Sequence, residues 1–149
     1  MLEKYLTNRL FVLYIIPFVL GTLTVFSFQP FNLSIINFLI IPTFFYFIIF
    51  IKKKSKNKYR KRPFKKNFFI FGILFGFGFF LSNIFWITNS LTFDENFKIL
   101  IPFALILIPL FLSLFFGAVT FFVGPYLNFN LSSVLLLSGS LAFSDFVRA

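Results

Sequence analysis

The sequence contains no cysteine and no histidine among its 149 residues. This absence excludes disulfide bonds, thiolate and imidazole metal sites, cysteine nucleophiles and histidine acid–base catalysis within the chain. Only four acidic residues are present, and we identify no catalytic constellation, cofactor site or metal site. Any catalysis by this chain alone would depend on those carboxylates or on Lys, Ser, Thr or Tyr.

Charge is also scarce. Charged residues make up 12% of the chain, whereas a typical soluble domain has about a quarter. Apolar residues make up 59%, with 30 Phe, and the mean hydropathy is +0.95. Because too few polar side chains are present to cover a surface in water, the composition predicts an integral membrane protein.

Five long apolar runs predict an all-α membrane fold with about five transmembrane helices. Each run reaches the ~17 residues that a short span requires. Pro30 and Phe31 fall between the first two runs, where proline favours a tight hairpin turn because it lacks an amide proton and restricts the preceding residue. We expect spans at about 10–28, 33–51, 68–87, 93–123 and 131–147, which leaves almost no room for an aqueous domain.

The basic residues are concentrated in one segment. Ten of the 14 Lys and Arg lie in residues 52–66, which we interpret as a cytoplasmic loop. This orientation places the amino terminus in the cytoplasm and the carboxyl terminus in the periplasm. Clustered basic residues can bind nucleic acid, but placement between two spans favours anionic lipid instead, and we expect no nucleic-acid partner. The headgroup-binding candidates are Lys52, Lys53, Lys54, Arg60 and Arg62.

Gly72 and Gly76 form a G-x-x-x-G motif within the third run, and Gly78 follows closely. Small residues at this spacing allow two helix backbones to approach each other. We interpret the three glycines as a helix-packing face within the chain, with homodimerisation as the alternative.

Three further residues are candidates for function near the outer ends of the spans. Trp86 is the only tryptophan, and indole rings favour the membrane interface. Asp145 and Arg148 are three residues apart and therefore neighbours on one helix face. An acid in an apolar run is a functional candidate by default, whereas an interfacial ion pair at a helix end is the simpler interpretation.

Three stretches together resemble the apolipoprotein N-acyltransferases. Residues 21–31, GTLTVFSFQPF, resemble the first-hairpin motif of that family. Residues 76–87, GFGFFLSNIFWI, resemble its Gly-x-Gly-x-Phe…Trp-Val stretch, and residues 144–149, SDFVRA, resemble its Glu-Phe/Trp-Leu-Arg-Gly segment. The chain departs from the family pattern at Thr88, where Tyr is frequent, and at Asp145, where Glu is frequent.

The resemblance implies part of an enzyme that transfers an acyl chain from a phospholipid to the amino-terminal diacylglyceryl-cysteine of a lipoprotein. The family's catalytic Glu, Lys and Cys lie in a nitrilase-like domain, which we do not find here. We therefore expect an inactive amino-terminal membrane portion in the bacterial inner membrane, with Trp86, Asp145 and Arg148 bordering the lipid opening or contacting the catalytic domain. The alternative is a small non-enzymatic membrane protein such as a transporter subunit.

Overall fold

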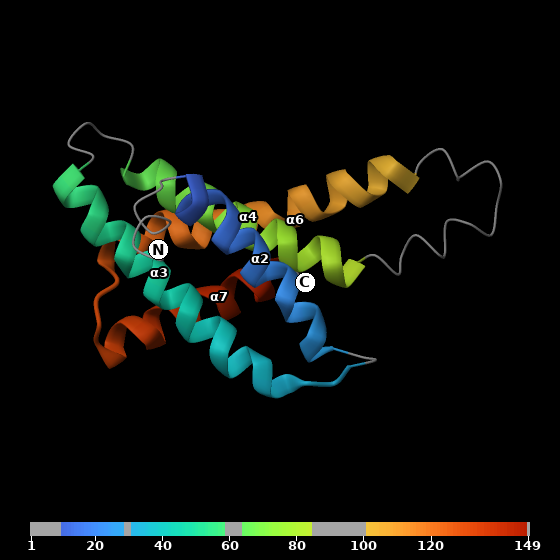
Figure 1. Ribbon diagram of the computed structural model, residues 1–149, viewed down its shortest axis with the longest axis horizontal. Helices are drawn as coiled ribbons and strands as arrows, with labels where there is room; N and C mark the ends of the chain where they lie inside the picture. Colours follow the sequence, from blue (N-terminus) through green and yellow to red (C-terminus); the bar gives the residue numbers. More distant parts are fainter. Residues whose placement is uncertain (1–9, 29–30, 59–63, 85–100, 149) are drawn as a thin grey trace.

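The computed structural model describes residues 10–28, 31–58, 64–84 and 101–148, and every regular element among them is helical. The described part begins with a continuous helical stretch of π, α and 3-10 geometry over residues 11–27 and closes with the hairpin of α6 and α7 (Figure 1). In chain order, the elements are η1 (Phe11–Ile15), α2 (Ile16–Leu23), η2 (Thr24–Ser27), η3 (Ser34–Ile36), α3 (Asn37–Lys58), α4 (Phe64–Ile84), α6 (Ile101–Val123), η5 (Gly124–Tyr126) and α7 (Leu131–Arg148).

Membrane-length helices account for most of this structure. Within the described residues, four helices are long and apolar enough to cross a membrane: Ser34–Lys54, Lys65–Ile84, Ile101–Tyr126 and Leu131–Arg148. The prediction of an all-helical membrane fold is therefore confirmed. The first predicted span is a shorter apolar helix, Phe11–Ser27, whose length of about 26 Å at 1.5 Å per residue is slightly less than a ~30 Å hydrocarbon core.

The predicted basic loop differs from the structure at both of its ends. Helix α3 continues to Lys58, and α4 already begins at Phe64. Lysine is a good helix former and can extend its ammonium away from an apolar stem, so a charged run does not stop a helix. Only residues 59–63 of the predicted loop lie outside the described residues.

Helix α4 is the centre of the bundle because its glycines admit neighbours on two sides. Gly78 meets the backbone of α2 at Phe18, and Gly72 meets α6, where an added Cβ would lie 3.0 Å from Gly117 Cα. The Thr120 hydroxyl joins α6 to α4 by donating to Phe68 O over 2.8 Å. Figure 1 shows α2, α4 and α6 grouped along one side of the molecule, with α3 crossing below them.

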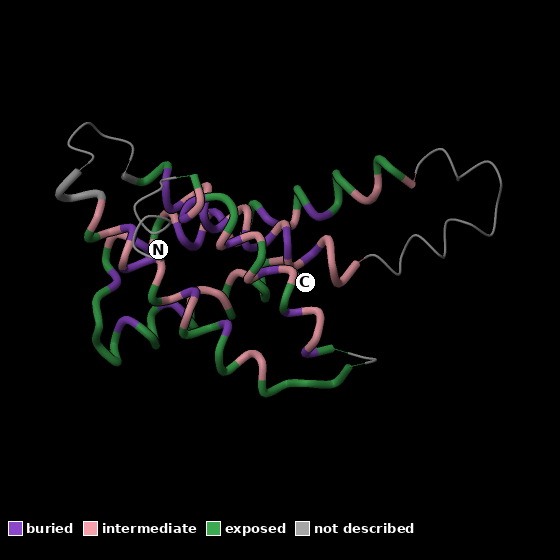
Figure 2. The backbone as a smooth tube through the Cα atoms, viewed as in Figure 1, coloured by how far each residue is buried: buried purple, intermediate pink, exposed green. Residues whose placement is uncertain are grey.

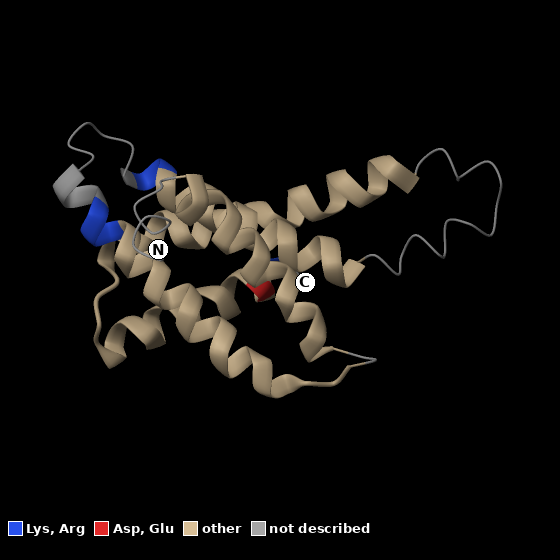
Figure 3. Ribbon diagram, viewed as in Figure 1, with Lys and Arg blue, Asp and Glu red and all other residues tan. Residues whose placement is uncertain are grey.

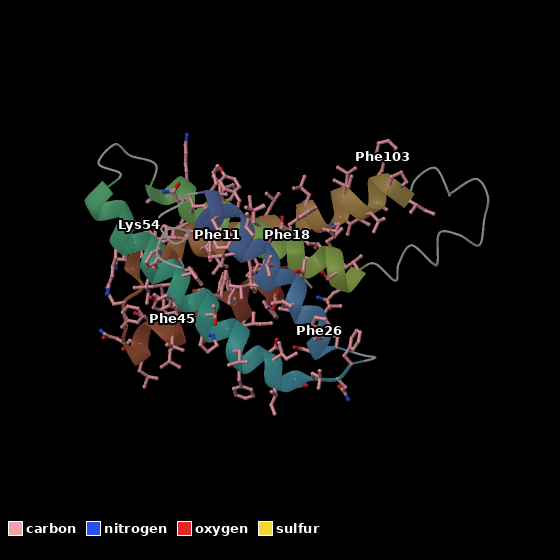
Figure 4. The ribbon with its side chains drawn as sticks, viewed as in Figure 1. Phe11, Phe18, Phe26, Phe45, Lys54 and Phe103 are labelled. Atoms are coloured by element: carbon pink, nitrogen blue, oxygen red, sulfur yellow. The ribbon has the colours of Figure 1, made fainter. Side chains whose placement is uncertain are left out.

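Burial differs between the inner and the outer faces of the helices (Figure 2). The buried apolar residues come mainly from the inner faces of α3 and α4, including Phe44, Ile48, Phe68 and Phe71, and the Phe44 ring stacks on that of Phe71 at 5.4 Å. The outer faces of α3, α6 and α7 carry exposed large apolar side chains, as expected for helices that meet lipid. Phe103, for example, projects from α6 away from the other helices (Figure 4).

Candidate functional site

An apolar crevice of about 460 Å³ opens between α3 and α7. Phe75 and Phe79 of α4 and Phe116 of α6 form its floor. Its other apolar lining residues come mainly from α3 and α7, which form the two walls of the crevice. The complete lining comprises Thr24, Asn37, Ile40, Ile41, Pro42, Phe44, Phe45, Phe75, Phe79, Phe116, Val134, Leu137, Ser138, Leu141 and Asp145.

Polar groups gather at the end of this crevice that lies farthest from the basic residues. Asn37 begins α3 there, and its Oδ1 accepts a hydrogen bond from the Ser27 hydroxyl at 2.9 Å. Thr24 donates its hydroxyl to Gly21 O at 2.5 Å, and the Asn83 side-chain amide donates to Phe79 O at 2.7 Å. These bonds satisfy polar groups within the bundle, as a low-dielectric surrounding requires.

Asp145 and Arg148 form an ion pair beside this polar end. Arg148 Nη2 lies 3.2 Å from Asp145 Oδ1, and the guanidinium carbon lies 5.0 Å from the centroid of the Phe80 ring. Because α4 continues beyond Phe80 to Ile84, the pair lies about one helical turn short of the end of α4. The pair also belongs to the last turn of α7, and the Arg148 and Asp145 side chains are 30% and 56% exposed, so it is a partly exposed ion pair at a helix end.

The opposite end of the bundle carries lysines (Figure 3), and those at residues 52–54 contact other parts of the protein. Lys52 donates to Leu127 O at 2.8 Å and to Asn128 Oδ1 at 2.9 Å. Lys53 and Lys54 instead lie over aromatic rings, 4.7 Å from the Phe129 centroid and 5.3 Å from the Phe50 centroid. Lys52 thus differs from Lys53, because its ammonium is hydrogen-bonded to a neighbouring segment.

The remaining candidates divide between described and undescribed parts of the chain. Gly72, Gly76 and Gly78 lie where α4 meets its neighbours most closely, and Gly76 faces Ser113 of α6. Phe31 packs edge-on against Phe26 with ring centroids 5.0 Å apart. Trp86, Pro30, Arg60 and Arg62 lie outside the described residues.

Sequence reasoning missed two features of this region. The first hairpin turns at Asn32, whose φ of 54° is left-handed, a conformation that asparagine tolerates better than most residues. The asparagine directly after Pro30 and Phe31 was the signal that could have revealed it. Asn37, Thr24 and Ser138 were also missed, because no local pattern shows that three separate helices share a crevice.

The fold and the crevice define a class of protein, namely a helical, multi-pass membrane protein whose apolar crevice opens between two of its spans. The apolipoprotein N-acyltransferase N-terminal domain matches residues 20–149. The chain therefore belongs to this family, and the resemblance inferred from the three sequence motifs is confirmed. Searches of curated proteins and of solved structures found no significant match.

Proposed function

We propose that this chain is the membrane anchor and lipid-access part of an apolipoprotein N-acyltransferase in the bacterial inner membrane. The complete enzyme would transfer an acyl chain from a phospholipid to a diacylglyceryl lipoprotein. Family membership supports the activity, and the crevice between α3 and α7 supports the access role. The chain has no cysteine, so the thiol of the reaction must come from outside these residues, and the chain alone is expected to be inactive.

The shape of the crevice suits one acyl chain entering from the side. Val134 and Asp145, which lie at its two ends on α7, are eleven residues apart, or about 16 Å at 1.5 Å per residue. This is about half of a ~30 Å hydrocarbon core and therefore close to the depth of one leaflet. Ile41 on α3 and Val134 on α7 are 57% and 45% exposed, so the rim between the two helices is open to lipid.

The proposed orientation directs the polar end of the crevice outward. The basic residues would be held on the cytoplasmic side, with Lys53 and Lys54 near anionic headgroups. Asp145 and Arg148 would then lie in the outer half of the membrane, where they and Trp86 would border the lipid opening or contact the catalytic domain.

Photolabelling tests the access role. The chain is reconstituted in vesicles that contain a phospholipid with a photoreactive acyl chain, and crosslinked residues are mapped by mass spectrometry. We expect crosslinks at crevice residues such as Leu137 and Leu141. Ser138→Trp, which fills the crevice, should reduce them several-fold, whereas the matched variant Ser140→Trp, on the α7 face toward α6, should not.

A uniform distribution of crosslinks over the lipid-facing surface would exclude the access role. If the crosslinks are as frequent on the exposed face of α6, around Phe103 and Ile106, as in the crevice, and Ser138→Trp leaves them unchanged, the label reports ordinary surrounding lipid. The chain would then be an anchor without a role in lipid access.

A further inference from the structure

The connection between α6 and α7 is fastened to the end of α3 by a cluster of contacts. Lys52 Nζ donates to Leu127 O and to the Asn128 side chain, at 2.8 and 2.9 Å. Lys53 lies over the Phe129 ring, and the Tyr46 ring lies 6.1 Å from that of Phe129. The segment that leads into α7 is therefore held by residues of α3.

Lys52 also satisfies an acceptor that the helix end leaves open. Carbonyl groups at the carboxyl end of a helix have no partner within the helix, and a buried carbonyl without a partner is costly. Leu127 directly follows η5, and its side chain is fully buried. The bond from Lys52 to Leu127 O thus joins a buried position of the α6–α7 connection to α3.

Apart from the packing of Leu127 and Phe129 on α3, little of the described structure links α3 directly to α7. Helix α3 packs mainly on α4 through Phe44 and its neighbours, α7 packs mainly on α6, and the crevice separates the two. At the far end, Arg148 of α7 lies over Phe80 of α4. Within the described residues, the Lys52 bonds are therefore the principal polar contact between α3 and the segment that leads into α7.

We infer that Lys52 is a positioning residue of the crevice, fixing the separation of α3 and α7 from their basic end. Without its bonds, the connection before α7 is held to α3 mainly by the packing of Leu127 and the contacts of Phe129 with Tyr46 and Lys53, so the separation of the two walls is less well defined and can increase. The effect on lipid access rests on the proposed function, whereas the separation of the helices does not.

Spin labels test the separation directly, because the chain has no native cysteine. One doubly labelled protein carries Ile41→Cys and Ser138→Cys, across the crevice. A reference protein carries Val19→Cys and Leu114→Cys, within the unit of α2, α4 and α6. Distances between the labels are measured by electron paramagnetic resonance in vesicles, for the otherwise wild-type protein and with Lys52→Met or Lys52→Arg added. Lys66→Met is the control, because Lys66 is an exposed lysine on α4.

With Lys52→Met, we expect the distance distribution across the crevice to shift to longer values and at least double in width, while the reference distribution stays unchanged. Lys52→Arg should restore the narrow distribution, and Lys66→Met should match the wild type. An unchanged crevice distribution in Lys52→Met would refute the inference, and so would equal broadening of both pairs, which indicates general loss of packing. If the crevice pair widens but the wild type takes up no photolabelled lipid there, the inference holds and the access role fails.

Discussion

At the scale of single residues, the glycines of this chain fall into two groups. Those of α2, α4, α6 and η5 have no room for a side chain: at Gly72 an added Cβ would lie 2.6 Å from Phe116 O. Gly139 of α7 has nothing within 4 Å of that position and is exposed. The same residue type therefore has a packing role in α4 and none in the described part of α7.

This contrast predicts opposite effects of one substitution. Gly72→Leu should destabilise the protein by about 1–3 kcal/mol or more, because the side chain forces α4 and α6 apart. Gly139→Leu should remain within about 1 kcal/mol of the wild type, on the stabilising side, because glycine is a poor helix former. Reversible unfolding in mixed detergent micelles measures both values. Equal destabilisation by the two variants would show that the contact of α4 with α6 is not specifically tight.

At the scale of elements, α7 is attached to the bundle at both ends and along α6. Its first turn follows the connection held by Lys52, and its last turn carries Arg148, whose guanidinium lies over Phe80 while its Nη2 pairs with Asp145. Between these points, α7 borders the crevice on one side. The stability of its last two turns should therefore depend strongly on the Arg148 contacts.

Amide hydrogen exchange tests this dependence. An exposed cation–π contact contributes about 0.5–1 kcal/mol, so Arg148→Met should speed exchange in residues 141–148 about two- to five-fold if opening is local. Phe80→Leu should reproduce the increase although the ion pair remains. Asp145→Asn, which keeps the ring contact, serves as the comparison. Faster exchange in Asp145→Asn but not in Phe80→Leu would assign the attachment to the ion pair instead.

The elements also show what a sequence of this kind can and cannot reveal. Long uncharged runs must be helical in lipid, since every backbone group needs an internal partner, and the helical nature of the described spans was predictable for that reason. Helix ends were less predictable: lysines did not stop α3, and the left-handed turn at Asn32 was not recognised. The crevice depends on contacts between distant segments, such as that of Lys52 with Leu127, which no local pattern contains.

At the scale of the whole molecule, charge separates the two ends of the bundle. Lys52, Lys53 and Lys65 gather where α3 ends and α4 begins, and the α6–α7 connection lies at the same end through its bonds to Lys52. Asn32 precedes α3, which begins at Asn37, and Asn37 is fifteen residues before Lys52, or about 22 Å along a helix. The hairpin around Asn32 and the α6–α7 connection should therefore face opposite sides of the membrane.

Cysteine accessibility tests this arrangement without any background thiol. Asn32 and Asn130 are both exposed, and each is replaced by Cys in turn. A membrane-impermeant maleimide should label Asn32→Cys in intact spheroplasts. It should label Asn130→Cys only after the membrane is permeabilised, because basic segments remain on the cytoplasmic side. A permeant maleimide provides the control that both thiols react. Labelling of both positions from one side would contradict the helical arrangement, and labelling in the reverse order would place Asp145 and Arg148 in the inner half of the membrane, away from an external catalytic domain.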